Sequence, residues 1–376
     1  MSKIEDLIKQ HCPNGVEYDV IENICKISRG RVMSKEYLRD NIGEYPVYSS
    51  QTVNEGMLGK IDTYDYDGEY LTWTTDGANA GSIFYRTGKF SITNVCGLLK
   101  IISNKVNTKF LHYYLGTVAK KYVNAGMGNP KLMSNVMATI KVAIPPLPVQ
   151  EEIVRILDAF TELEKELEKE LEKRKQQYEY YRNKLLTFDE NTTGGIKFMP
   201  LSEVCNIYTG GEVPDDSIKG DIPDETHIYP IYGNGREVYG YSSSYRIDKD
   251  AVCISSIGAN TGAVFFYEKY FTPIIRLKVL VPKNDNLNTR YLYYITSTLT
   301  FVSKNGGGIP NMNANDVKKH IIPIPPIEEQ ERIVGILDKF DALVNDISIG
   351  LPAEINGRRQ QYEYYRDKLL TFEEAA

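Results

Sequence analysis

The sequence is poor in the residues that build disulfide frameworks and metal sites. Its 376 residues include five cysteines and four histidines. The cysteines are odd in number and widely spaced, and no two form a Cys-x-x-Cys pair, so we expect neither disulfides nor a zinc site. The histidines are equally scattered, which argues against a catalytic triad or a metal site. These residues are Cys12, Cys25, Cys96, Cys205, Cys253, His11, His112, His227 and His320.

Long apolar runs are also missing. No stretch of about 18 apolar residues occurs, and a membrane-spanning helix requires one. The N-terminal segment MSKIEDLIKQ lacks the apolar core of a signal peptide. We therefore expect a cytoplasmic protein with no membrane partner.

The sequence lacks the short motifs that mark common catalytic and cofactor sites. It contains no G-x-x-x-x-G-K-[ST] phosphate loop, no His-Glu-x-x-His motif and no His-x-Glu motif paired with Cys-x-x-Cys. A methyltransferase would need a glycine-rich cofactor loop after a strand, and none is found. Asn129 and Pro130 are followed by Lys131, so the Asn-Pro-Pro-Tyr type of adenine-flipping motif is not matched. We expect no catalytic residue, no metal and no cofactor in this chain.

The net charge of −6 conceals basic and acidic stretches that alternate along the chain. Residues 77–149 contain nine Lys or Arg and no Asp or Glu, whereas residues 150–190 contain eight basic and twelve acidic residues. Residues 251–325 have eight basic and three acidic residues, and residues 326–376 have six and eleven. Lys and Arg neutralise phosphates, so the basic stretches are compatible with nucleic acid. Chance clustering on a solvated face is the alternative, and the repetition weakens it.

The feature that organises the sequence is an internal duplication. IPPLPVQEEIVRILDAF (residues 144–160) matches IPPIEEQERIVGILDKF (324–340) at an offset of 180. RKQQYEYYRNKLLTF (174–188) matches RRQQYEYYRDKLLTF (358–372) at an offset of 184, so four residues are gained between these blocks. Elsewhere the match is weaker, as in YPVY against YPIY and DGANAG against IGANTG. Near-identical segments suit a shared partner, and divergent ones suit different ligands.

Each repeat ends in a long helix. Residues 150–188 contain no Gly or Pro, and their apolar positions step by 4 and 3, which predicts one helix of roughly 58 Å at about 1.5 Å per residue. Near Leu351 the second copy has a doubled step of 4, and Pro352 should break or kink the helix there. We expect the two helices to pair as an antiparallel coiled coil with pseudo-two-fold symmetry, with a leftover face for a further chain. The predicted pairing and docking residues are Ile153, Leu157, Phe160, Leu167, Leu171, Tyr178, Tyr181, Leu185, Ile333, Leu337, Phe340, Tyr362, Tyr365 and Leu369.

The globular parts are predicted to be α+β. Residues 95–102 and 272–282 are β-rich runs, and residues 251–267 have the glycines of a hairpin. A short helix follows in each copy, at 107–122 and 288–302. The expected domains are 1–148 and 191–327, separated by a first helix at 149–190 and followed by a second helix at 328–376 that is broken near 350–352.

Polar, aromatic and basic side chains gather in glycine-rich loops at matching places in both copies. Such side chains read base edges, and basic residues hold phosphates. An ordinary polar turn is the better explanation of any single loop, but the recurrence of the whole set at the same places in both copies favours recognition. The candidates for binding DNA are Arg29, Arg31, Tyr48, Ser49, Ser50, Gln51, Trp73, Thr74, Asn79, Asn129 and Lys131 in the first copy, and Tyr208, Thr209, Tyr232, Asn234, Arg236, Ser255, Ser256, Asn260, Asn305, Asn311 and Asn313 in the second.

At these motifs the chain resembles the specificity subunit of type I restriction-modification systems. The resemblance rests on the Pro-Pro-x-x-x-Gln-x-x-Ile-x-x-x-Leu runs at 145–157 and 325–337, the YYRNKLLTF and YYRDKLLTF helix ends and the paired GAN segments. It implies two target-recognition domains, each reading half of an interrupted site in double-stranded DNA. It further implies helices that act as a spacer and dock two modification subunits. Those partners would carry S-adenosylmethionine and methylate adenine, and restriction subunits would join to cleave.

Two features depart from that pattern, and two other classes of function stay open. The break at 350–352 puts strict helix symmetry in doubt, and the long acidic loop at 215–225 puts the transfer of contacts between copies in doubt. A structural coiled-coil adaptor with protein-binding ends would explain the helices but not the acid-free basic stretch. An enzyme with an unrecognised site is disfavoured because no nucleophile and base are arranged together.

Overall fold

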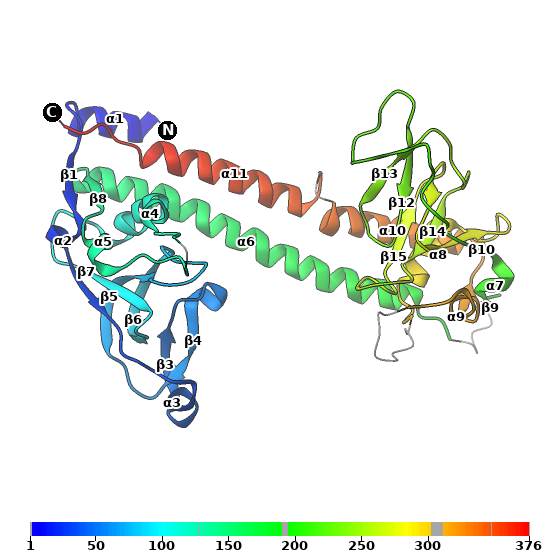
Figure 1. Cartoon of the computed structure of the whole chain (residues 1–376), viewed down its shortest axis with the longest axis horizontal. Coiled ribbons are helices and arrows are strands. Elements are labelled where there is room, and N and C mark those ends of the chain that lie inside the picture. The colour runs from blue at the N-terminus through cyan, green and yellow to red at the C-terminus, as the bar shows by residue number, and fades with distance from the viewer. Residues whose placement is uncertain (1, 127, 190–194, 302–310, 347, 376) are drawn as a thin grey trace. The chain divides into compact units, whose positions relative to one another are not determined.

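The structure is a computed structural model that describes residues 2–126, 128–189, 195–301, 311–346 and 348–375 (Figure 1). It divides into two compact units. Unit 1 comprises Met1–Glu168 and Ile355–Ala376, and unit 2 comprises Lys169–Glu354. Each unit therefore combines one globular domain with parts of both long helices. Among the described residues, no helix has the length and apolar character needed to cross a lipid bilayer.

Unit 1 is built on a six-stranded sheet with the order β2-β7-β5-β6-β3-β4. Its pairs are antiparallel except β3 with β6, which run parallel. Gly68 and Gly88 lie opposite each other where β5 pairs with β6, and both have positive φ values, of 130° and 76°, that a residue with a Cβ rarely adopts. They let these two strands continue through a bend. The strands are β2 (Cys25–Arg29), β3 (Ile42–Tyr48), β4 (Met57–Ile61), β5 (Tyr66–Thr74), β6 (Ile83–Ile92) and β7 (Cys96–Ile101).

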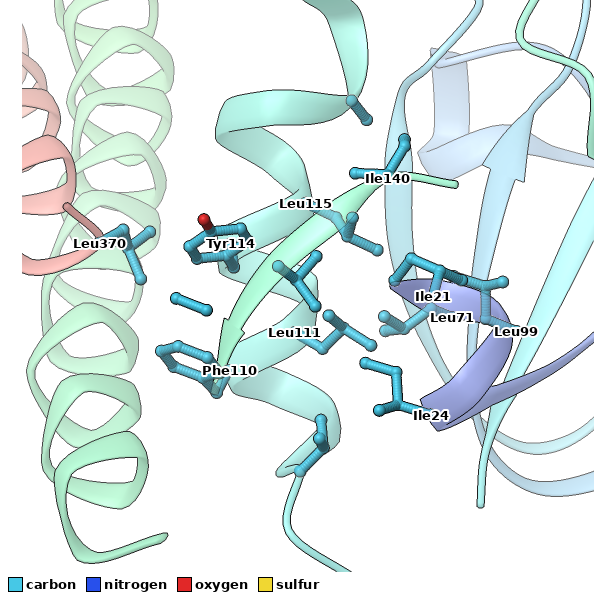
Figure 2. Close-up of a cluster of buried hydrophobic side chains, with 14 of the residues drawn as sticks. Ile21, Ile24, Leu71, Leu99, Phe110, Leu111, Tyr114, Leu115, Ile140 and Leu370 are labelled. Carbon is cyan, nitrogen blue, oxygen red and sulfur yellow. The ribbon is translucent and has the colours of Figure 1, made fainter. Parts of the chain in front are cut away.

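Helix α4 (Thr108–Val118) covers this sheet and begins where the side chain of Asn107 accepts a hydrogen bond from the backbone of Phe110. Figure 2 shows Phe110, Leu111 and Leu115 of α4 with Leu71 and Leu99 of the sheet in one buried cluster. Leu370, from the end of α11, faces Tyr114 in the same view, so the C-terminal segment completes this core. The other elements of the domain are α1 (Ser2–His11), β1 (Glu17–Val20), α2 (Ile21–Ile24), α3 (Lys35–Asp40), η1 (Val53–Gly56), η2 (Ala119–Tyr122), α5 (Ser134–Ala138) and β8 (Lys141–Ile144).

A second connection to the C-terminal segment runs through the backbone. Strand β1 pairs antiparallel with β8, and Val16, just before β1, forms a bridge with Glu374. The N–H of Val16 donates to the carbonyl of Glu373 at 2.9 Å, and the N–H of Ala375 donates to the carbonyl of Val16 at 2.9 Å. The hydroxyl of Tyr18 donates to the carbonyl of Phe372 at 3.0 Å.

Unit 2 repeats this plan with its sheet divided in two. The orders are β10-β17-β14-β15 and β11-β13-β12-β16. The long β6 of unit 1 corresponds here to two short strands, β15 and β16, and Tyr270 takes a φ of 70° between these strands. Lys249 and Lys269 stand at the positions of the two glycines. The strands are β9 (Lys197–Pro200), β10 (Cys205–Thr209), β11 (Ser217–Lys219), β12 (Tyr229–Tyr232), β13 (Val238–Ser242), β14 (Ala251–Ile254), β15 (Val264–Tyr267), β16 (Thr272–Pro273), β17 (Lys278–Pro282) and β18 (Ile321–Ile324), and the helices are α7 (Leu201–Val204), α8 (Thr289–Thr296) and α9 (Ala314–Lys318).

These elements test the local predictions. The α+β class, the hairpin at 251–267 and the two short helices are confirmed. The run 272–282 is not one strand, because the chain turns at Ile274–Leu277 between β16 and β17. The segment 215–225 is not wholly a loop, since β11 pairs antiparallel with β13 inside it.

The first long helix, α6 (Leu147–Leu186), has 40 residues, as the sequence predicted within a few residues at each end. It begins earlier than expected because Pro148 lies in its first turn, where a missing N–H costs no hydrogen bond. The second helical segment consists of two helices, α10 (Ile327–Asn345) and α11 (Leu351–Leu369).

The break between α10 and α11 is confirmed, but Pro352 does not cause it. Pro352 lies in the first turn of α11, where proline is tolerated. The chain leaves α10 at Asp346, whose carboxylate accepts from the N–H of Ser348 at 2.7 Å. Gly350 then packs against the last turn of α10 so closely that a Cβ there would lie 2.4 Å from the carbonyl oxygen of Ala342. The turn that ends at Gly350 therefore makes the break.

Candidate nucleic-acid interface

In unit 1, a turn at the end of β6 holds together three of the predicted loops, which are residues 28–31, 48–52 and 72–81. The N–H of Thr93 donates to the carbonyl of Tyr48 at 2.9 Å, and Thr93 forms an isolated bridge with Arg31. Val95 accepts from Thr75 twice, from its N–H at 3.2 Å and its hydroxyl at 2.9 Å. Loops that are distant in sequence thus meet at residues 93–95.

The fourth loop of unit 1, which contains Asn129 and Lys131, bonds to the GAN segment (residues 76–81) and to Thr75. The N–H of Gly77 donates to the carbonyl of Pro130, and the N–H of Leu132 donates to the carbonyl of Thr75, both at 3.0 Å. Lys131 lies beside Asp76, with Nζ 3.7 Å from the carboxylate. The guanidinium of Arg29 contacts the sulfur of Met133 at 3.9 Å. All four candidate loops of the first domain therefore form one continuous surface.

Unit 2 has the same arrangement around residues 274–277. The N–H of Ile274 donates to the carbonyl of Tyr232 at 2.9 Å, and Ile274 forms a bridge with Gly211. The hydroxyl of Ser256 donates to the carbonyl of Arg276 at 2.7 Å. The N–H of Met312 donates to the carbonyl of Ser256 at 2.8 Å, which ties in the fourth loop.

The two GAN segments adopt the same turn. Gly81 donates its N–H to the carbonyl of Thr74 at 2.9 Å, and Gly262 donates to Ser255 at 2.8 Å. Gly77 and Gly258 have φ values of 90° and 86°, so glycine is required at the first position of each turn. The Asn79 and Asn260 side chains are exposed at the tips.

Four of the predicted contact residues are buried, and we correct the candidate list accordingly. Trp73, Thr74, Ser255 and Ser256 are 0% exposed. The indole of Trp73 donates to the carbonyl of Leu132 at 2.9 Å inside the core. A side chain that its own domain covers completely cannot reach a base edge, so these four residues hold the loops in place.

A second group of candidates is partly buried and engaged within the domain. The ring of Tyr48 lies 3.6 Å from the guanidinium of Arg86, and the hydroxyl of Thr93 donates to Ser49 Oγ at 2.8 Å. The amide of Gln51 donates to the carbonyl of Met57 at 2.6 Å. In unit 2 the Asn234 oxygen accepts from the N–H of Ser256 at 2.8 Å, and Tyr232 stacks on Tyr267 with centroids 3.6 Å apart. The partly buried candidates are Tyr48, Ser49, Ser50, Gln51, Tyr232 and Asn234.

The side chains of the remaining described candidates are exposed at the surface. Arg31 also pairs with Asp65 at 3.1 Å, and Asn313 caps α9. Asn305 lies outside the described residues. The exposed candidates are Arg29, Arg31, Asn79, Asn129, Lys131, Tyr208, Thr209, Arg236, Asn260, Asn311 and Asn313.

A cation occupies a matching pair of strand positions in each domain, but on different strands. Arg29 of β2 lies opposite Gly97 of β7, and Thr209 of β10 lies opposite Lys278 of β17. Arg29 is exposed, whereas Lys278 is 5% exposed and donates to the hydroxyl of Thr209 at 3.3 Å. Burial lowers the pKa of Lys278, and the nearby charge of Arg276 lowers it further.

The junction between each domain and its helix is the same in both units. The side chains of Gln150 and Gln330 are fully buried. Each accepts from one backbone N–H, at 2.8 and 2.9 Å, and donates to two carbonyls at 2.6 to 2.8 Å. About two turns further along the helix, Asp158 accepts from Lys109 Nζ at 2.6 Å, and Asp338 accepts from the guanidinium of Arg290 at 2.6 Å.

The predicted helix-pairing residues divide into two groups. Ile153 and Leu157 are buried in the core of the first domain, and Ile333 and Leu337 in that of the second, so they fix each helix to its own domain. The second group consists of residues that are only partly buried: Phe160, Leu167, Leu171, Tyr178, Leu185, Phe340, Tyr362 and Tyr365. Of the two remaining predicted residues, Leu369 is buried and Tyr181 is 36% exposed.

The turns at 93–95 and 274–277 and the cation Lys278 were missed by sequence reasoning. Residues 274–278 lay within a run that looked like one strand. A signal was available, since Arg276 and Lys278 interrupt an otherwise apolar run. The Asp158 and Asp338 pairs could also have been found, because both lie in the repeated helix segment.

Two comparisons show the family, and a third shows the fold. The model of the type I restriction modification DNA specificity domain matches residues 13–173 and again 194–357. A type I specificity subunit of Mycoplasma pneumoniae is 37% identical over 354 residues, covering 93% of this chain and 96% of the relative. The specificity subunit of the type I restriction enzyme MpnII of the same organism is 47% identical over 172 residues, covering 45% of this chain and 52% of that protein. The crystal structure of a type I S subunit from M. genitalium shares the fold, with a TM-score of 0.64, 15% identity and coverage of 95% and 96%.

The chain belongs to the type I restriction modification DNA specificity family. It is a specificity subunit with two target-recognition domains, one in each half of the duplication. The resemblance noted in the sequence is confirmed, and the alternative of a structural adaptor is not favoured.

Proposed function

We propose that each domain reads one half of an interrupted site in double-stranded DNA. The observation that carries the proposal is that in each unit one turn holds three loops together and the described part of a fourth loop bonds to one of them, with exposed cations and amides on the surface that they form. Cations position a protein on phosphates, and amides and guanidinium groups read base edges. The shared backbone frame and the different side chains suit two different half-sites.

We further propose that the long helices pair as an antiparallel coiled coil with pseudo-two-fold symmetry and set the distance between half-sites. Matching contacts inside each unit support this. Phe160 stacks on Tyr365 with centroids 5.7 Å apart, and Phe340 stacks on Tyr181 at 5.5 Å. In unit 1, Glu168 and Glu164 both contact Arg359, which precedes Tyr365 by nearly two turns, so the contacts run in opposite directions along the two helices.

The near-identical helix ends would dock two modification subunits, to which restriction subunits are added. These partners would bind S-adenosylmethionine and methylate adenine in the cytoplasm, while this chain contributes recognition without catalysis. Exposed Tyr180 and Tyr364 occupy equivalent positions in the repeat and are 61% and 63% exposed, which gives each copy the same aromatic surface.

Exchange of one domain tests the proposal. Residues 1–145 would be replaced by the corresponding part of the M. pneumoniae relative, and the full chain would be co-expressed with its modification subunits. Modification sequencing of the host genome should show a change in one half of the methylated motif. Exchange of the second domain is the matched control and should change the other half. A change in both halves, or methylation without a bipartite motif, would contradict the proposal.

A further inference from the structure

The turn between β16 and β17 has a backbone that its residues do not favour. Ile275 and Arg276 have φ values of 51° and 60°, in the left-handed region where side chains with a Cβ are rare. A β-branched residue such as Ile275 is the least suited to it. Both side chains are nevertheless exposed, Ile275 to 47%, so burial of the isoleucine does not explain the strain.

The surrounding loops fix this turn through the backbone of both residues. The N–H of Ile275 donates to the carbonyl of Gly211 at 2.8 Å, and that of Arg276 donates to Gly210 at 3.1 Å. The carbonyl of Ile275 accepts from the amide of Asn234, and that of Arg276 accepts from the hydroxyl of Ser256 at 2.7 Å. Since every polar backbone group of the pair is bonded inward, the two side chains are presented outward on a rigid frame.

The charge at this turn is not balanced within the domain. Arg276 is followed two residues later by the buried Lys278. Within the described ranges, no ion pair joins either cation to a carboxylate, and the ammonium of Lys278 donates to the hydroxyl of Thr209 at 3.3 Å. Two adjacent cations without an acidic partner favour a ligand rich in acceptors and negative charge.

The first domain differs at the corresponding turn. Asn94 and Val95 occupy the positions of Ile275 and Arg276, and neither has a positive φ. The strained turn is therefore a property of the second domain and not of the shared frame. Side chains that differ between domains on a common frame are those expected to distinguish two DNA sequences.

We propose that Ile275 and Arg276 form the reading tip of the second domain. Arg276 donates its guanidinium hydrogens to the acceptors of a guanine edge, and Ile275 packs on the neighbouring base, where a thymine methyl is the natural apolar contact. Because the buried Lys278 carries the same charge, it disfavours packing of the Arg276 side chain against its own domain. The inference rests on the proposed function and names the residues that determine specificity in one half-site.

Three variants of the full chain, co-expressed with its modification subunits, test the tip. Arg276→Ala and Arg276→Lys should each lower the preference for one base pair of the second half-site by roughly tenfold or more, since lysine keeps the charge but loses the two-pronged geometry. Ile275→Asn should weaken an adjacent position without lowering Tm, because asparagine tolerates a positive φ. Lys283→Ala, one residue past the end of β17, is the control and should leave the motif unchanged.

The readouts are the methylated motif and the binding of duplexes with single base-pair changes. If the unaltered chain gives no bipartite motif, the proposed function itself fails. If it gives one and the Arg276 variants keep the same preference at every position, the reading tip is wrong. Equal weakening on all sequences would also overturn it, because that result marks a phosphate contact. A lowered Tm for Ile275→Asn would show that the turn serves the fold.

Discussion

Tyr48 in unit 1 and Tyr232 in unit 2 occupy matching strand positions but have different neighbours. Tyr48 lies under the guanidinium of Arg86, which is 4% exposed and whose pKa is lowered by burial. Tyr232 stacks on Tyr267, the residue at the position of Arg86, with an interplanar angle of 6°. Arg86 also donates to the carbonyl of Glu55, so a buried cation fixes the neighbouring loop in unit 1. The same backbone frame thus tolerates an ionic and an aromatic support.

The cross-strand pair of residues beneath the loops also differs between the two units. Trp73 lies over Gly97 in unit 1, and Ile254 lies opposite Lys278 in unit 2. A Cβ at Gly97 would lie 2.2 Å from the indole, so the glycine is required by the tryptophan. In contrast, the helix junctions keep the same hydrogen bonds at Gln150 and Gln330. The residues that support the loops thus differ between the units in pairs, where a change in one residue is compensated by a change in its neighbour. The hydrogen bonds at the domain–helix junction are the same in both units.

The largest loss of stability is expected when only one residue of such a compensated pair is substituted. Gly97→Lys should destabilise the first domain by about 3 kcal/mol, because the side chain collides with Trp73. Hydrogen exchange of β5 and β7 amides measures this domain separately. The double variant Trp73→Ile with Gly97→Lys reproduces the pair of unit 2 and should recover part of the loss. Two independent and additive effects would refute the compensation.

A smaller and equal effect is expected at the junction. Asp158→Asn and Asp338→Asn each weaken hydrogen bonds to a cation and to a tyrosine hydroxyl, of Tyr113 at 2.7 Å and of Tyr294 at 2.5 Å. Since the carboxylates are partly exposed, we expect a loss of about 1 to 2 kcal/mol in each unit. Hydrogen exchange of α4 and α8 measures both. Clearly unequal losses would show that the junctions only look alike.

The smallest effect distinguishes the domains by pH. His112 of α4 is matched by Tyr293 in α8, and burial lowers the pKa of His112 to about 4. As the pH falls, the histidine is protonated in the unfolded chain before it is protonated in the folded domain. The contribution of the neutral His112 to the stability of the domain is therefore complete above about pH 6.5 and is lost as the pH falls towards 4. At pH 5.5 the first domain should lose about 1 kcal/mol relative to pH 7.5. Hydrogen exchange at the two pH values measures the loss, and His112→Tyr should remove it. A first domain that keeps its stability at pH 5.5 would contradict the neutral histidine.

The long helix and the short helices could be predicted because their signals are local. Proline and glycine positions, apolar periodicity and Asn107 and Asn288 at the helix starts define where each helix begins within a few residues, although α8 ends six residues earlier than expected. The turn at 274–277 could not be predicted, because its backbone is held by bonds to Gly210, Gly211 and Asn234, which are distant in the sequence.

Periodicity also identified which helix residues are apolar but not what they contact. Ile153 and Leu157 fit the coiled-coil pattern, yet they lie in the core of their own domain. An apolar period of 3.5 residues is the same whether the helix packs against another helix or against its own domain. Among the recognition candidates, residue type favoured Trp73 and Ser255, but their burial depends on strands that pair across the domain.

The composition of unit 1 has a consequence for the order in which the protein is made. Its core includes Leu369 and Leu370, and Glu374 forms a bridge with Val16 next to β1, whereas unit 2 is the single segment Lys169–Glu354. A ribosome releases residues 355–376 only after the whole of unit 2. The domain whose synthesis starts first is therefore completed second, and during translation the part of its core that residues 355–376 supply is still missing.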